Sequence, residues 1–100
     1  MVEGLRFQWD SSNVSHIARH AVVPKEVEQA LLNDPYDLSY ETVEEEERWT
    51  SIGHTDSLRV LLVVWTIREG EAGEVVRVIT AREATRTART EYLRAKGFAL

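Results

Sequence analysis

The segment from Leu58 to Ile67 constrains the fold more than any other part of this chain. It is rich in β-branched residues and nearly continuous in apolar ones, which is typical of a strand covered on both faces. We therefore expect this strand at the centre of a sheet. A turn over Gly70 to Gly73 and a second apolar segment, Val75 to Thr80, follow it. The two segments are predicted to pair as an antiparallel hairpin.

The residues near the N-terminus predict a short strand and two helices. Apolar and polar residues alternate over positions 5–9, as in a half-buried strand. A first helix is expected to start at the N-cap candidates that begin with Asp10 and to run to about His20, because apolar residues then recur at helical spacing. Pro24 suits the first position of a second helix, which the sequence at 33–35, Asn-Asp-Pro, is expected to end.

The rest of the chain predicts two more strands and a last helix. One strand is expected at Leu38 to Thr42 and another at Arg48 to Ile52, with Glu44 to Glu47 as a solvated connection. The last helix is expected to begin near Thr80. These elements predict a single α+β domain over residues 1–100, with a mainly antiparallel bent sheet of four to five strands. Two N-terminal helices and one C-terminal helix are expected to pack on one face of this sheet.

Composition narrows the classes of function that this chain can have. It contains no cysteine, which excludes disulfides, thiolate zinc sites and cysteine nucleophiles and fits a reducing compartment. The longest apolar run, Val60 to Trp65, is too short to span a bilayer. The N-terminus also lacks the pattern of a signal peptide. We therefore expect a cytoplasmic protein without a membrane partner.

Charge is unevenly distributed along the chain. The net charge of −5 opposes general binding to nucleic acid, because such binding depends on neutralising phosphates. However, residues 34–47 carry seven acids and no base, whereas residues 77–96 carry six bases and two acids. The local field of the C-terminal part therefore remains compatible with a polyanionic substrate.

Two histidines on the first predicted helix are the main candidates for chemistry. Asn13, His16 and His20 fall within one narrow sector of an ideal helix. Histidine has an unperturbed pKa near neutrality, so a pair can supply one base and one acid for proton transfer. RNA cleavage without a metal needs such a pair together with fixed cations for the phosphate. The candidate cations are Arg48, Arg59, Arg77 and Arg82.

Simpler interpretations of the same residues remain open. One histidine can be a partly buried structural residue and the other an ordinary surface residue. A shared zinc ion is a third interpretation, with Asp10, His54 or a glutamate as a further ligand. However, Ile17 occupies the position of the glutamate in the metalloprotease helix motif, so we expect no metal and no cofactor. The arginines of the last helix fit a solvated face, and the three tryptophans are expected in the core rather than stacked on bases.

Several short motifs follow one another in a definite order along the chain. Together they resemble the BrnT family of bacterial type II toxins, small ribonucleases related in fold to the RelE-like toxins. The resemblance covers nearly the whole chain and rests on order and spacing rather than on any single motif. The motifs are Phe7-Gln8-Trp9-Asp10, Asn13, His16, Arg19-His20-Ala21-Val22, Asp34-Pro35, Glu47-Arg48, Ile52-Gly53, Arg59-Val60-Leu61, Trp65-Thr66-Ile67-Arg68, Arg77 to Arg82, Ala84, Thr85, Arg89 and Tyr92.

The resemblance implies an RNA-cleaving toxin that a BrnA-type antitoxin neutralises and whose operon that antitoxin represses. By position, His20 is similar to the family's motif histidine, and Arg48, Arg59 and Arg82 to its recurrent arginines. Asn13 is similar to its helix asparagine, and His16 matches a subset of relatives. The chain departs from the family at four positions: Ser11 and Ser12 stand where a lysine is frequent, Ala21 replaces a glycine, and Ala88 replaces a glutamate.

Two hypotheses follow for the function. The first is a metal-independent endoribonuclease with RNA as substrate, an antitoxin as partner, and self-association or a toxin–antitoxin hetero-oligomer left open. Its predicted catalytic residues are His20, His16, Arg82, Arg59 and Arg48, and its predicted substrate-binding residues are Asn13, Arg77, Arg68 and Arg89. It expects His20 and Arg82 to face each other across one solvent-accessible cleft. The second hypothesis is a catalytically silent module, a degenerate toxin that binds an antitoxin-like partner through its acidic segment or apolar edge.

Overall fold

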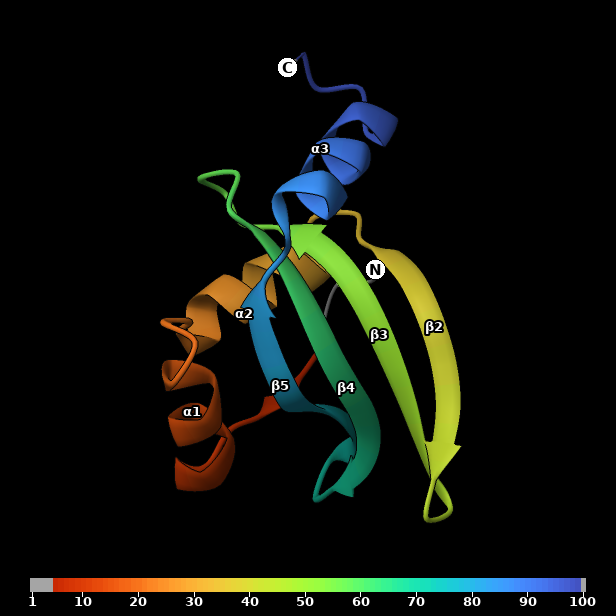
Figure 1. Cartoon of the computed structure of the whole chain (residues 1–100). Coiled ribbons are helices and arrows are strands. Elements are labelled where there is room, and N and C mark those ends of the chain that lie inside the picture. Colours follow the sequence, from red (N-terminus) through yellow and green to blue (C-terminus); the bar gives the residue numbers. More distant parts are fainter. Residues whose placement is uncertain (1–4, 100) are drawn as a thin grey trace.

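The computed structural model describes residues 5–99, which form a five-stranded sheet and three helices (Figure 1). The strands lie side by side in the order β1-β5-β4-β3-β2. The predicted α+β class is therefore confirmed. The elements are β1 (Phe7–Gln8), α1 (Ser11–Ala18), α2 (Pro24–Leu32), β2 (Tyr36–Val43), β3 (Glu46–His54), β4 (Val60–Gly70), β5 (Gly73–Glu83) and α3 (Arg86–Ala95).

Strand pairing is antiparallel everywhere except at one edge of the sheet. β2, β3, β4 and β5 pair with their neighbours antiparallel, whereas β1 pairs with β5 in parallel. The predicted β4–β5 hairpin is confirmed, and its strand β4 lies at the centre of the sheet. Register shifts occur in β2 between Asp37 and Ser39, and in β5 at Ile79, where Val64 and Trp65 of β4 pair with Thr80 and Val78. Such bulges bend strands locally and increase their twist.

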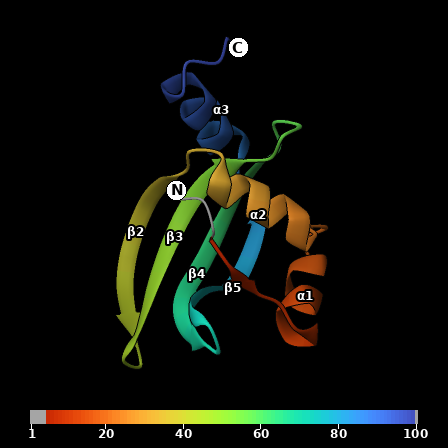
Figure 2. The same ribbon diagram turned by 180° about the vertical axis from the view of Figure 1, so that it is seen from behind.

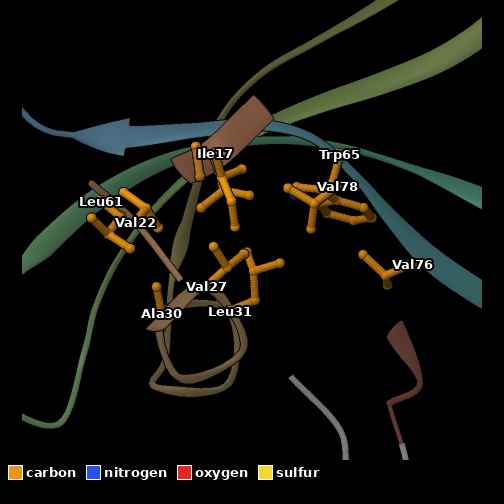
Figure 3. Close-up of a cluster of buried hydrophobic side chains, with 11 residues drawn as sticks. Ile17, Val22, Val27, Ala30, Leu31, Leu61, Trp65, Val76 and Val78 are labelled. Atoms are coloured by element: carbon orange, nitrogen blue, oxygen red, sulfur yellow. The ribbon is translucent and has the colours of Figure 1, made fainter. Parts of the chain in front are cut away.

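The larger hydrophobic core lies between the sheet and the first two helices. Figure 2 shows α1 and α2 together on one face of the sheet. Alternate residues of β4 point to this face, because side chains of a strand alternate between its two sides. Trp65 is buried there, and Trp9 and Trp49 pack partly buried against this core, as predicted. The buried residues are Ile17, Val22, Val27, Ala30, Leu31, Leu61, Val63, Trp65, Val76, Val78 and Ala81 (Figure 3).

A second, smaller core lies on the opposite face of the sheet. Tyr92 and Leu93 of α3 pack there against Ile52 of β3 and Val60 of β4. The prediction that all helices pack on one face is therefore wrong for α3. The reason is that β4 is apolar on both sides, so its second face also needs a cover. No helix among residues 5–99 has the length and apolar character needed to cross a membrane.

Two helix boundaries differ from those predicted. The first helix ends at Ala18 rather than at about His20, and the chain turns at Ala21, whose φ is 58°. The last helix begins at Arg86 rather than near Thr80, because β5 stays paired with β4 up to Glu83. Thr85 then caps α3 by accepting a hydrogen bond from the backbone N–H of Ala88. Arg82 consequently belongs to a strand and not to a strand-to-helix junction.

A glycine sets the close approach of α2 to the sheet. Gly53 of β3 is buried, and a Cβ atom at this position would clash with the backbone carbonyl of Ala30 in α2. Only glycine leaves room for this contact. The helix can therefore lie directly on the strand.

Candidate active site

The start of α1 is fixed to the sheet by Asp10 and Asn13. The Asp10 carboxylate accepts hydrogen bonds from the backbone N–H groups of Ser12 and Asn13, and the Asn13 side-chain oxygen accepts one from the backbone N–H of Asp10. This reciprocal arrangement is a capping box. It determines where the first turn of α1 lies.

The side chain of Asn13 makes three hydrogen bonds within the protein. Asn13 is 3% exposed, and its amide nitrogen donates to the backbone carbonyls of Gln8 and Val78 at 2.9 and 3.3 Å. The residue thus connects α1 to β1 and β5. These contacts engage both N–H groups of the amide, so the observed contacts of Asn13 are structural.

His16 and His20 lie next to each other, as their spacing predicts. Their ring centroids are 6.1 Å apart, in an edge-on arrangement with an interplanar angle of 61°. His16 is half-buried on α1, whereas His20 is exposed in the turn that follows this helix. The ring of His16 is therefore partly covered by its surroundings, and the ring of His20 is open to solvent.

His16 and Arg77 line the same hollow, which has a volume of about 170 Å³. It lies where the first turns of α1 approach β5. The Arg77 guanidinium donates to the carboxylate of Asp10 at 2.9 Å and to the side chain of Gln8 at 3.1 Å. The hydrogen bond from Arg77 lowers the pKa of Asp10, so this carboxylate remains charged. The lining residues are Ser12, Asn13, His16, Arg77, Val78 and Ile79.

Two carboxylates compensate the positive charge of Arg59. Its guanidinium donates to Glu26 of α2 at 3.0 Å and to Glu83 of β5 at 3.1 Å, and also to the backbone carbonyl of Ala21. Arg59 thus connects β4 to the turn after α1, to α2 and to the end of β5. A phosphate would have to compete with both acids for this cation.

Arg48 and Arg68 share one acidic partner. Both contact the Glu46 carboxylate, at 3.2 and 2.7 Å. Arg68 and three consecutive glutamates line a hollow of about 280 Å³. Its acidic walls repel a phosphate group, so we do not regard it as the substrate site. Its lining residues are Glu45, Glu46, Glu47, Trp49, Thr66, Ile67 and Arg68.

Arg82 and Arg89 are exposed and form no ion pair with any residue in the described range 5–99. Arg82 pairs with Leu62 across β4, and Arg77 pairs with Thr66. Leu62 and Thr66 are four residues apart on one strand, so they point to the same side of the sheet. Arg77 and Arg82 therefore also share that side.

The expected meeting of His20 with Arg82 is not among the contacts of residues 5–99. No hydrogen bond or ion pair between described residues joins them, and neither lines the three hollows found there. Instead, Arg77 is the arginine that the fold brings beside the histidine pair, through His16. The spacing of the helix could not indicate this, because Arg77 reaches the hollow only through the pairing of β5 with β1.

In the part of the chain that the structure covers, no third zinc ligand lies close to His16 and His20. Among residues 5–99 no group of three or more histidines, cysteines or acids lies close enough to hold a metal. His54, one of the expected further ligands, lies elsewhere and makes a 2.8 Å hydrogen bond through Nδ1 with the Tyr92 hydroxyl. Burial raises the pKa of Tyr92 to about 12. This third histidine therefore serves the packing of α3.

Comparison with known proteins assigns the chain to a family. No curated protein matches the sequence significantly. A family model described as "ribonuclease toxin, BrnT, of type II toxin-antitoxin system" matches residues 9–87, which include α1, α2, β2 to β5 and the start of α3. The chain therefore belongs to the BrnT family of ribonuclease toxins of type II toxin–antitoxin systems.

Proposed function

We propose that this chain cuts RNA with its own side chains, without a metal, as a cytoplasmic endoribonuclease toxin. One observation carries the proposal: His16 and Arg77 line a single open hollow, and His20 lies beside His16. This hollow joins titratable rings to a fixed cation, the combination that phosphodiester cleavage through the ribose hydroxyl requires. Membership of a family of ribonuclease toxins supports the same activity.

The reaction proceeds by attack of the ribose 2′-oxygen on the adjacent phosphorus. A neutral imidazole accepts the proton of the 2′-hydroxyl, the 2′-oxygen bonds to phosphorus, and the bond to the 5′-oxygen breaks. A protonated imidazole donates its proton to that leaving oxygen. The products are a 2′,3′-cyclic phosphate and a free 5′-hydroxyl. His20, which is exposed, and His16 share the two proton-transfer roles.

Arginines stabilise the additional negative charge of the transition state. Arg77 is placed at the hollow, and Arg82 and Arg89 bring charges that no carboxylate of residues 5–99 compensates. Arg48, Arg59 and Arg68 contact carboxylates and line no hollow with a histidine of the described range, so they contribute less to phosphate binding. Arg77 also contacts a carboxylate, that of Asp10, but it lines the hollow beside His16. The proposal therefore assigns the scissile phosphate to Arg77, with Arg82 and Arg89 binding other phosphates of the RNA.

Cleavage of single-stranded RNA in the presence of EDTA tests this proposal. We expect the wild-type protein to cut RNA but not the same strand carrying 2′-deoxy sugars. His16→Ala and His20→Ala should each slow cleavage by roughly 10²–10⁴-fold, the usual contribution of a general acid or base. Arg82→Ala should also slow it, whereas Arg94→Ala, an exposed arginine in the last turn of α3, serves as the control.

Two outcomes would contradict the mechanism. Cleavage that EDTA abolishes would show a metal-dependent reaction. Cleavage that both histidine variants retain in full would place the proton transfers elsewhere. Circular dichroism of each variant separates loss of activity from loss of fold.

A catalytically silent binding module is the second candidate. The net charge of −5 favours it, as do the carboxylates that compensate Arg48, Arg59 and Arg68. Equal inactivity of the wild-type protein and the variants towards RNA, with tight binding to a BrnA-type antitoxin, would support this candidate. In both cases the expected partner is an antitoxin, bound in a hetero-oligomer.

A further inference from the structure

An apolar groove lies between β2 and α3, away from the histidines. Its volume is about 230 Å³, and most of its accessible lining is apolar. Its lining residues come from the start of β2, from β3 and from α3. Figure 1 shows α3 at the end of the sheet where β2 begins. The lining residues are Tyr36, Leu38, Ile52, Ala88, Glu91, Tyr92 and Ala95.

Large apolar side chains are exposed along β2 beside this groove. Tyr36 is 41% exposed and Leu38 56%, and both line the groove. The bulge between Asp37 and Ser39 adds Leu38 as an extra residue beside the groove. Two large exposed apolar residues that line one groove indicate an interaction surface more strongly than scattered ones do.

The backbone of β2 also has hydrogen-bonding groups available. Within residues 5–99 β2 pairs only with β3 and forms one edge of the sheet. An edge strand offers a row of N–H and C=O groups to which another strand can pair. The groove and this edge are contiguous, because Tyr36 and Leu38 belong to both.

Charge determines which partner fits this surface. Four glutamates near this surface form no ion pair with any residue of the described range. They are Glu41 on β2, Glu44 and Glu45 in the turn after it, and Glu91 in the groove. The nearby Lys96 is already engaged by Asp34 at 2.8 Å. RNA would be repelled here, and a second copy of this chain would bring an equally acidic edge. A basic polypeptide with apolar side chains complements both properties of the surface.

We propose that the antitoxin docks by adding a basic, partly apolar strand to the free edge of β2 and placing an apolar side chain in the groove beside α3. The inference rests on the antitoxin partner of the proposed function, and it holds whether or not the chain cuts RNA. Strand addition supplies affinity through backbone hydrogen bonds, and the groove supplies specificity.

The test measures binding of the purified antitoxin from the same operon to the full chain by isothermal titration calorimetry. Leu38→Lys puts a cation into the groove and should weaken binding at least about ten-fold. Leu32→Lys changes a similarly exposed leucine at the end of α2 and should bind like the wild type. Glu41→Lys should also weaken binding, whereas Glu71→Lys, in the exposed β4–β5 turn, should not.

Hydrogen exchange tests the strand addition itself. Alternate backbone N–H groups of β2 point away from β3, and they should become protected when the antitoxin binds. Equal affinities of Leu38→Lys and Leu32→Lys, or unchanged exchange over residues 36–43, would overturn the inference. So would a dimer of the chain alone that Leu38→Lys dissociates, because the edge would then bind a second copy.

The RNA cleavage assay separates this inference from the proposed function. Leu38→Lys should cut RNA at the wild-type rate and should need more antitoxin for inhibition. If the wild-type chain cuts no RNA but Leu38→Lys still loses antitoxin affinity, the ribonuclease proposal fails and the docking surface stands. If cleavage is normal and antitoxin affinity is insensitive to Leu38→Lys, the docking surface is wrong and the ribonuclease proposal stands.

Discussion

The arginine side chains of this protein differ in what their guanidinium groups contact. Arg59 faces two carboxylates, and Arg48 and Arg68 share a third. These charges connect strands and helices to one another. Arg82 has no such partner among residues 5–99, so it can bind a phosphate without first releasing an acid. Sequence position alone could not separate these roles, because, apart from the local Arg48–Glu46 pair, these ion pairs join segments that are distant along the chain.

Asn13 is expected to stabilise the fold rather than to bind RNA. Asn13→Ala would leave the backbone carbonyl of Val78 without its buried hydrogen bond and should lower the free energy of unfolding by about 1–3 kcal/mol. Urea denaturation measures this change, with Ser15→Ala at an exposed position of the same helix as control. A loss of RNA cleavage with unchanged stability would instead restore a substrate-binding role.

The proximity of the two histidines was predictable, and their cationic neighbour was not. Residues four apart share one side of a helix, which places the rings of His16 and His20 side by side. Although α1 ends before His20, the chain continues in hydrogen-bonded turns, with the His20 N–H donating to the Ile17 carbonyl. Arg77, by contrast, reaches His16 through pairing between the first and last strands, which a single sequence does not reveal.

At the level of elements, local signals predicted the strands better than the ends of the helices. The glycines of the β4–β5 turn and the flanking apolar runs identified the hairpin. The same signals could not locate the start of α3. Ala81, Arg82 and Glu83 favour a helix by intrinsic propensity, but their pairing with β4 keeps them extended. The cap at Thr85 then sets where the helix begins.

The contact of α2 with β3 depends on the missing side chain of Gly53. Gly53→Ala would push a methyl group against the Ala30 carbonyl and separate helix from strand. We expect a loss of about 1–3 kcal/mol in the free energy of unfolding, the usual effect of overpacking a core. Thermal unfolding followed by circular dichroism measures it, with Thr50→Ala on the other side of the same strand as control. An unchanged midpoint would mean that α2 does not lie this close to the sheet.

In the whole molecule, the strand that carries the proposed phosphate-binding arginines and the acidic edge strand lie apart within the sheet. β5, with Arg77 and Arg82, and β2, with its glutamates, are three strand intervals apart, roughly 14 Å. The uneven charge along the sequence is therefore also an uneven charge in space. The fold class was predictable because the strand and helix periods are clear. The location of α3 was not, since it depends on which face of β4 remains uncovered.

The dependence of RNA binding on salt should reflect this separation. If only Arg77, Arg82 and Arg89 neutralise phosphates, the logarithm of the binding constant should fall with the logarithm of salt concentration with a slope of about −2. Fluorescence anisotropy with uncleavable 2′-O-methyl RNA measures the slope. Arg82→Ala should reduce its magnitude by about 0.7, and Arg94→Ala should leave it unchanged. A slope several times steeper would mean that more of the surface contacts RNA.

The brevity of β1 limits how copies of this protein can assemble. Within the described residues 5–99, β1 is only two residues long and is followed within three residues by α1, so this part of the border offers little backbone for another chain to join. β2, with eight residues, is the border that can be extended. A sheet that accepts a new strand at one border only cannot propagate into a fibre, and each toxin would recruit a single antitoxin strand in this way. Growth by strand pairing therefore stops after one step.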